Sequence, residues 1–124
     1  MRITFLPGSF SLCRLAPDQE IPNWAIADKS FCSVTYTPQE LSIVCPSDVV
    51  PADVHCDSGW VILGVEGPMD LSLIGVLASL SVPLADAGIP VFAISTYNTD
   101  YLLIMEEKVH AARQALEAAG HQVV

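Results

Sequence analysis

The order of apolar segments in the second half of the chain is the feature that most restricts its fold. Short β-branched or apolar runs, each bounded by turn residues, occur at Val61–Val65, Val91–Ile94 and Tyr101–Met105. Runs of this kind are typical of buried strands. The polar segment 95–100 joins the second run to the third and has the composition of a hairpin connection. We therefore expect these two strands to be antiparallel neighbours.

A helical pattern separates the first run from the second. Leucines recur at helical spacing within Leu71–Ala87, Asp70 stands where it can cap the first turn, and Gly88 can end the helix. Pro83 lies inside this pattern and has no backbone N–H to donate. We therefore expect a kink, or an early end of the helix near Leu80–Val82.

A second helical pattern follows the third run. It begins at Glu106 and Glu107, whose charges suit a helix N-terminus, and Gly120 closes it. Its expected buried face consists of Val109, Ala112, Leu116 and Ala119. The last four residues can return as an edge strand. The resulting βαββαβ order predicts an α+β fold of the ferredoxin-like kind, in which an antiparallel sheet carries its helices on one face.

The N-terminal half contains strand-like runs but little helix. The runs lie at Phe10–Leu15, Phe31–Thr37 and Leu41–Cys45, and short helical turns are expected at 22–25 and 46–50, where a proline can start each turn. This order is that of a shrunken copy of the C-terminal half. We therefore expect a degenerate N-terminal unit at 1–58 and a complete C-terminal unit at 59–124.

The composition restricts the partners. The chain has a net charge of −9, which repels nucleic acid and anionic lipid surfaces and suits a cationic or zwitterionic ligand better. The stretch Leu71–Ala87 is too interrupted by polar residues for a membrane span, and residues 1–10 lack the apolar run of a signal peptide. We expect a cytoplasmic protein that binds neither membranes nor nucleic acid.

The residues most often used in catalysis form no recognisable motif. Cys13, Cys32, Cys45 and Cys56 match no CxxC pattern, and we interpret all four as buried, reduced thiols. The three histidines show no metal-binding spacing, and the glycines form no phosphate-binding loop. Adjacent strand residues point to opposite faces, which argues against a dyad of His55 with Cys56. We expect no enzyme activity, no metal and no cofactor.

Four segments carry a family resemblance: Leu41–Pro46, Val65–Pro68, Gly75–Ala78 and Ile94–Tyr101. They resemble short bacterial ACT-domain proteins, which are related to the cytosolic arginine sensor and to the regulatory half of aspartate kinases. The resemblance covers most of the chain and implies two ACT units in tandem. It also implies a ligand site where the loop after the first strand of a unit enters the first helix, facing the second strand.

Carried onto this chain, the resemblance selects two groups of binding residues. They are Pro68, Met69, Asp70, Leu71 and Ser72 in the loop, and Thr96, Tyr97, Asn98, Thr99 and Asp100 in the hairpin. Backbone N–H groups of residues 71–73 at the helix start suit a carboxylate, and Asp100 or Asp70 suits an ammonium group. Two simpler interpretations stay open: Asp70 as a plain helix cap, and Asp100 as an ordinary turn carboxylate.

The leading hypothesis is a regulatory sensor that binds an amino acid and has no catalytic activity. We expect it to form a homodimer through ACT sheet edges and to signal to a protein effector. The alternative is a structural or oligomerisation module of ACT type that binds no metabolite.

Overall fold

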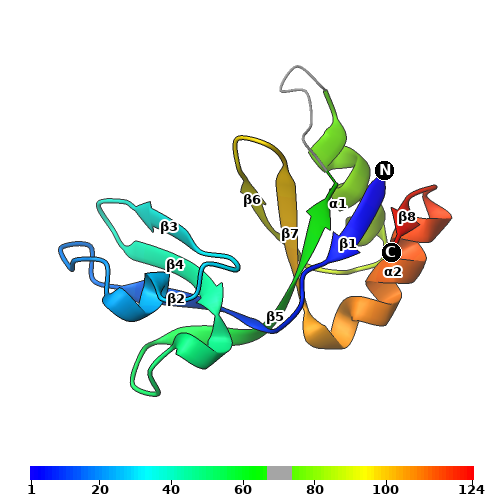
Figure 1. The fold of residues 1–124 in the computed structure, drawn as a ribbon. Helices are drawn as coiled ribbons and strands as arrows, with labels where there is room; N and C mark the ends of the chain where they lie inside the picture. The colour runs from blue at the N-terminus through cyan, green and yellow to red at the C-terminus, as the bar shows by residue number, and fades with distance from the viewer. Residues whose placement is uncertain (67–73) are drawn as a thin grey trace. The chain divides into compact units, whose positions relative to one another are not determined.

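The chain folds into two compact units in a computed structural model, which describes residues 1–66 and 74–124 (Figure 1). One unit consists of Met1–Pro7 together with Val61–Val124, and the other of Gly8–Trp60. The long strand β5 (Cys56–Val65) contributes its second half to the first of these and its first half to the second.

The unit that contains the C-terminus has the predicted βαββαβ order, which confirms the ferredoxin-like α+β fold. After the second half of β5 come α1 (Val76–Asp86), β6 (Phe92–Ser95), β7 (Asp100–Met105), the 3-10 turn η3 (Glu106–Lys108), α2 (Val109–Ala118) and β8 (Gln122–Val123). The hairpin prediction is also confirmed, because β6 and β7 pair in antiparallel fashion with Ser95 opposite Asp100.

An additional strand, β1 (Arg2–Phe5), completes the sheet of this unit. The strand order is β6-β7-β5-β1-β8, so β1 lies between the first and the last strand of the βαββαβ series. Ile3 of β1 is opposite Val65 of antiparallel β5 and also opposite Val123 of parallel β8. The division of the chain therefore differs from the expected one at its start, since Met1–Pro7 was expected in the N-terminal unit.

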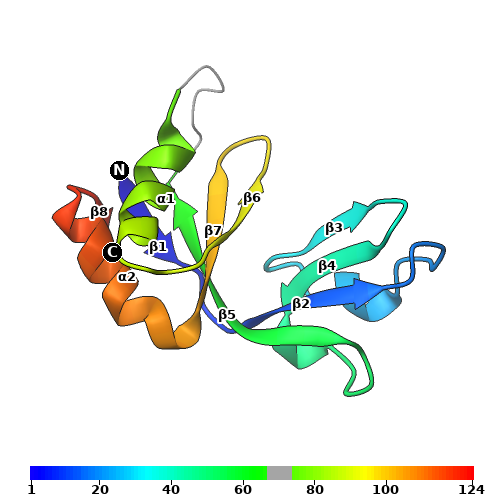
Figure 2. The ribbon, with the colours of Figure 1, turned by 180° about the vertical axis from the view of Figure 1, so that it is seen from behind.

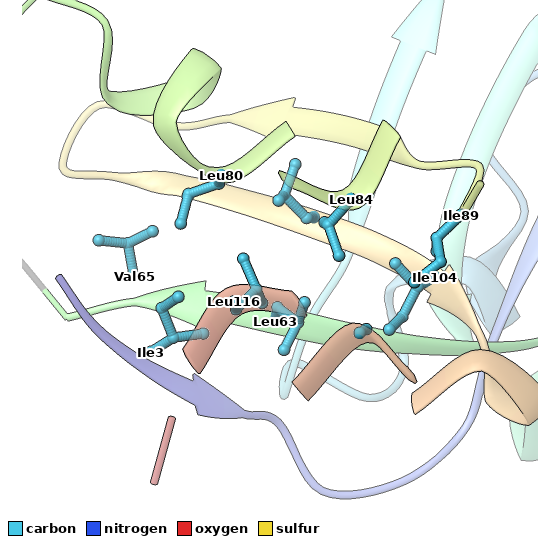
Figure 3. Close-up of a cluster of buried hydrophobic side chains, with 10 residues drawn as sticks. Ile3, Leu63, Val65, Leu80, Leu84, Ile89, Ile104 and Leu116 are labelled. Carbon is cyan, nitrogen blue, oxygen red and sulfur yellow. The ribbon is translucent and has the colours of Figure 1, made fainter. Parts of the chain in front are cut away.

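Both helices pack on one face of this sheet and enclose the core (Figure 3). Leu63 and Val65 of β5 point into the core because alternate strand residues share a face. The other buried members lie in β1, α1, β7 and α2 and in the segment before β6. They are Ile3, Leu80, Leu84, Ile89, Leu102, Ile104, Ala112 and Leu116. Of the predicted face of α2, Ala112 and Leu116 are fully buried and Val109 is partly buried. Ala119 is exposed, which corrects the prediction, because α2 ends at Ala118.

Helix α1 begins later than predicted and passes through Pro83 without ending. Ile74 and Gly75 precede the helix, and Gly75 takes the N-cap position with a positive φ of 78°. The expected cap, Asp70, lies outside the described residues. The helix continues to Asp86, and Gly88 (φ 75°) ends it as predicted, with the Ile89 N–H donating to the Leu84 carbonyl.

His121 explains why Pro83 is tolerated inside α1. Proline cannot donate to the carbonyl four residues earlier, which is that of Ser79. The Nε2 atom of His121 lies 2.9 Å from this carbonyl oxygen and must be the donor, because a carbonyl only accepts. The histidine therefore replaces the missing helical hydrogen bond, and the expected early end near Leu80–Val82 was wrong, since α1 continues to Asp86.

The second unit repeats the βαββαβ order with 3-10 turns in place of helices (Figure 2). Its elements are β2 (Phe10–Leu15), η1 (Asn23–Ile26), β3 (Ser33–Tyr36), β4 (Leu41–Pro46), η2 (Ser47–Val49) and the first half of β5. The order β3-β4-β2-β5 is antiparallel throughout. The three predicted strands and both turns are confirmed. A small core of Cys13, Ala25, Leu41, Ile43 and Cys45 lies in this unit.

The prediction for the cysteines is correct for two of the four. All are free thiols, and Cys13 and Cys45 are buried in the core of the second unit. Cys32 and Cys56 are exposed, contrary to expectation. Cys32 directly precedes β3 and Cys56 is the first residue of β5, so each lies at the end of a strand, where burial is incomplete.

A double-mutant cycle tests the role of His121 in α1. We expect His121→Ala to lower the free energy of unfolding by about 1 kcal/mol, because the Ser79 carbonyl loses its donor. Pro83→Ala restores a backbone N–H to the helix, so His121→Ala should cost clearly less in that background. Urea unfolding of the four proteins measures both effects. An equal cost of His121→Ala in the two backgrounds would contradict the assignment.

Candidate functional site

The β6–β7 hairpin is tied to the end of β5 by a buried threonine. The Thr99 hydroxyl donates a hydrogen bond of 2.9 Å to the Val65 carbonyl oxygen, and only 8% of Thr99 is exposed. Because β5 ends at Val65, this bond holds the hairpin beside the point where the chain leaves the sheet. The structure therefore gives Thr99 a structural contact and no exposed hydroxyl.

A second threonine closes the turn of the hairpin. The Thr96 N–H donates to the Thr99 carbonyl at 2.8 Å, and the Thr96 hydroxyl donates to the same oxygen at 3.1 Å. These two donors hold the turn, and no residue of the turn needs a positive φ. Among the described residues only glycines have a positive φ. Thr96 is thus also used mainly in shaping the hairpin.

Asp100 is oriented by the residue opposite it in the hairpin. The Ser95 hydroxyl donates to Asp100 Oδ1 at 2.6 Å, and this is the single side-chain hydrogen bond of Asp100 within the described part of the chain. The Asp100 side chain is partly buried. A carboxylate has about four acceptor positions on two oxygens, so Asp100 can still accept from a ligand.

The tip of the hairpin is open to solvent. Tyr97 is 82% exposed and Asn98 is also exposed. An exposed phenol and an exposed amide add little to the stability of the turn, and both can reach a molecule bound beside it. Of the five predicted hairpin residues, Tyr97, Asn98 and Asp100 therefore offer polar groups to a ligand, and Thr96 and Thr99 build the hairpin.

The other predicted group, Met69, Asp70, Leu71 and Ser72, lies outside the described residues, as does Pro68. The segments that flank it are described. Figures 1 and 2 both place the hairpin tip and the first turn of α1 at the same end of the unit. The end of β5 lies there too, because Thr99 contacts Val65.

The start of α1 offers backbone donors, at positions later than those predicted. The N-cap residue is Gly75, which has no side chain with which to cap the helix. The N–H groups of Val76, Leu77 and Ala78 belong to the first turn, where no intrahelical acceptor exists. Because the helix begins at Val76, the carboxylate-binding role that the sequence suggested for residues 71–73 stays a prediction.

An ion pair at the same end of the sheet was missed by sequence reasoning. Arg2 Nε lies 2.9 Å from Glu66 Oε1, and both side chains are 48% exposed. The Glu66 N–H also donates to the Arg2 carbonyl. The two residues are far apart in the sequence, and the pair could have been found only by recognising the alternation of Ile3 and Phe5 as a strand.

The second unit contains a shallow pocket of about 350 Å³. It is lined by Arg14, Leu15, Ala16, Pro17, Gln39 and His55, none of which was a predicted site residue. Within residues 1–66 and 74–124, no three His, Cys, Asp or Glu side chains are grouped in a way that suits a metal ion. The helices described there are also too short or too polar to cross a membrane.

The fold and the hairpin define a ferredoxin-like unit with its polar site at the end of the first strand of the βαββαβ series. Residues 55–118 match the family model for the ACT domain, so the chain belongs to the ACT domain family. A second family model, for an N-terminal domain, matches residues 8–53, which fall inside the second unit. The resemblance noted from the sequence is thereby confirmed.

The chain is also similar to three known proteins. It is similar to a protein from Agobacterium tumefaciens of known crystal structure, with 36% identity, 99% of this chain and 91% of that chain covered, and a TM-score of 0.93. The regulatory subunit of aspartate kinase from Thermus thermophilus shares the fold at 17% identity, with 93% and 94% covered and a TM-score of 0.61.

The human protein CASTOR3P is 29% identical over 89 residues, which are 61% of this chain and 55% of that protein. The chain thus spans about half the length of this curated relative.

Substitution of Thr99 tests the anchor of the hairpin. Thr99→Val keeps the shape of the side chain but leaves the Val65 carbonyl without this donor, so we expect a loss of about 1 to 3 kcal/mol in the free energy of unfolding. Thr99→Ser keeps the hydroxyl and should lose less. Chemical denaturation distinguishes them, and equal stability of the two variants would show that the hydrogen bond contributes nothing.

Proposed function

We propose that this protein is a cytoplasmic regulatory protein without catalytic activity, and that it binds a free amino acid between the β6–β7 hairpin and the start of α1. Membership of the ACT domain family supports the coarser part, a ligand-binding regulatory role. The hydrogen bond from Thr99 to Val65 is the observation that carries the amino-acid site. It holds the hairpin beside the end of β5, at the same end of the unit as the start of α1.

The chemistry of an amino acid matches what this end of the unit offers. Its carboxylate needs hydrogen-bond donors, and the N–H groups of Val76, Leu77 and Ala78 are donors whose effect the helix dipole strengthens. Its ammonium group needs an acceptor, and Asp100 can accept a charge-assisted hydrogen bond. The exposed Tyr97 and Asn98 are free to contact the rest of the ligand.

The proposal keeps the predicted loop residues, Met69, Asp70, Leu71 and Ser72, as ligand contacts. In the sequence they lie between the end of β5 and the start of α1. It also keeps a homodimer formed through sheet edges, for which β6 and β8 are the outer strands of the C-terminal unit. A protein effector would then respond to the ligand-bound dimer.

A second candidate function is a module that associates without binding a metabolite. The observation that favours it is the exposure of two large apolar side chains: Ile74, shortly before α1, is 96% exposed, and Val82, within α1, is 55% exposed. Large apolar side chains that are exposed in a single chain can be covered by another protein. On this view Asp100 is only a turn carboxylate held by Ser95.

Thermal denaturation in the presence of each of the twenty amino acids tests the main proposal. A ligand that binds only the native state raises its stability, by about 2.7 kcal/mol at a concentration of one hundred times Kd. We expect one amino acid or a small related set to raise Tm. If none does so at millimolar concentration, the amino-acid proposal fails.

Substitution of Asp100 locates the site and separates the two functions. We expect Asp100→Asn to abolish most of the ligand-induced rise in Tm, because the amide cannot pair with an ammonium group as the carboxylate does. Asp18→Asn, in an exposed turn of the other unit, makes the same charge change and should keep the full response. An unchanged response of Asp100→Asn would remove this residue from the site.

A further inference from the structure

All four cysteines belong to the second unit, where two of them are direct cross-strand partners. Cys13 of β2 is paired with Cys56 of antiparallel β5. Cys13 is only 3% exposed, whereas Cys56 is open to solvent. The pair therefore combines one core thiol with one that a small molecule in solution can reach.

The hydrogen-bond pattern shows which kind of cross-strand pair this is. The next pair along the ladder carries a hydrogen bond, from the Arg14 N–H to the His55 carbonyl at 3.0 Å. Bonded and non-bonded pairs alternate in an antiparallel ladder, so Cys13 and Cys56 form a non-hydrogen-bonded pair. Their Cα atoms are expected about 4.5 Å apart, which lies within the range that a disulfide spans.

The Cys13 and Cys56 side chains share a face of the sheet, because the two residues are directly opposite each other. Burial raises the pKa of the Cys13 thiol, and the neighbouring Cys56 raises it further. Cys45 is opposite Ser11 and thus diagonal to Cys13 on the same face of the sheet. These thiols are not a metal centre, since the described residues hold no group of three or more such side chains suited to one.

We infer that Cys13 and Cys56 are a thiol pair that small-molecule disulfides oxidise to a reversible cross-strand disulfide, which links β2 to β5. The reaction consumes one small disulfide and releases two small thiols. Nothing in this inference depends on the proposed amino-acid site, because both cysteines belong to the other unit.

The order of the two steps follows from exposure. The Cys56 thiolate attacks one sulfur of the small disulfide, its S–S bond breaks, and the first small thiol leaves with the proton from Cys56. The Cys13 thiolate then attacks the Cys56 sulfur of this mixed disulfide. The second small thiol leaves with the proton from Cys13, and the new bond joins the two strands.

Burial explains why the core thiols do not react first. It raises the pKa of the Cys13 thiol to about 11 and that of Cys45 to about 12, so both stay protonated at neutral pH. Only the thiolate is a nucleophile, and Cys13 is therefore slow toward reagents in solution. Once Cys56 carries the mixed disulfide, Cys13 lies directly opposite it in the sheet. This proximity offsets the low fraction of Cys13 thiolate.

The link would matter for the unit that contains it. Residues 8–60 form a short unit with 3-10 turns in place of helices and few fully buried residues. Small units of this kind gain most from a covalent connection between strands. Oxidation is therefore expected to stabilise the β2–β5 pair, and reduction to release it.

Incubation of the native protein with oxidised glutathione tests the inference. Mass spectrometry should show the loss of two hydrogen atoms, and peptide mapping without reduction should recover residues 13 and 56 in one linked product. Tm should rise on oxidation and return with dithiothreitol. A protein that keeps four free thiols, or that joins Cys13 to Cys45, overturns the inference.

Three variants complete the test. Cys56→Ser, at an exposed position, should prevent the intramolecular disulfide, and Cys13→Ala should stop the reaction at a glutathione adduct on Cys56. Cys32→Ser removes the other exposed thiol and should leave disulfide formation unchanged. If Cys56→Ser still forms an intramolecular disulfide, or Cys32→Ser abolishes it, the pair is wrongly assigned.

Discussion

The pairing of β1 with two strands at once is the interaction on which the C-terminal unit depends. Ile3 lies opposite Val65 on one side and Val123 on the other, and its side chain is buried between the helices and the sheet. Without β1, the first and last strands of the βαββαβ series would have to pair directly. The first seven residues thus belong to the same unit as the last sixty-four, and residues 8–60 form an insertion between them.

The polar residues of the β6–β7 hairpin divide into those that stabilise the hairpin and those that are candidates for ligand binding. The Thr96 hydroxyl donates to a carbonyl oxygen of the turn, and the Thr99 hydroxyl donates to a carbonyl oxygen of β5. Asp100 receives one hydrogen bond from Ser95 and keeps acceptor capacity, and Tyr97 and Asn98 face solvent. Residue type alone could not separate these roles, because each depends on which carbonyl lies within reach.

Contacts between residues that are far apart in the sequence also explain what the sequence did not reveal. Pro83 was expected to disturb α1, but His121, which follows α2 in the sequence, supplies the missing hydrogen bond. The cysteines show no recognisable spacing, yet Cys13 and Cys56 are opposed because β2 and β5 are neighbours in the sheet. The Arg2–Glu66 ion pair arises in the same way from the β1–β5 neighbourhood.

The type and order of the elements could be predicted from the amino-acid sequence, and they include the βαββαβ series, the β6–β7 hairpin, the short N-terminal strands and the glycine that ends α1. These are properties of local periodicity and turn chemistry, which neighbouring residues specify. The place of β1, the start of α1 and the partners of Thr99, His121 and Cys56 became known from the three-dimensional fold. Each of these depends on contacts between residues far apart in the chain, and local propensity carries no information about such contacts.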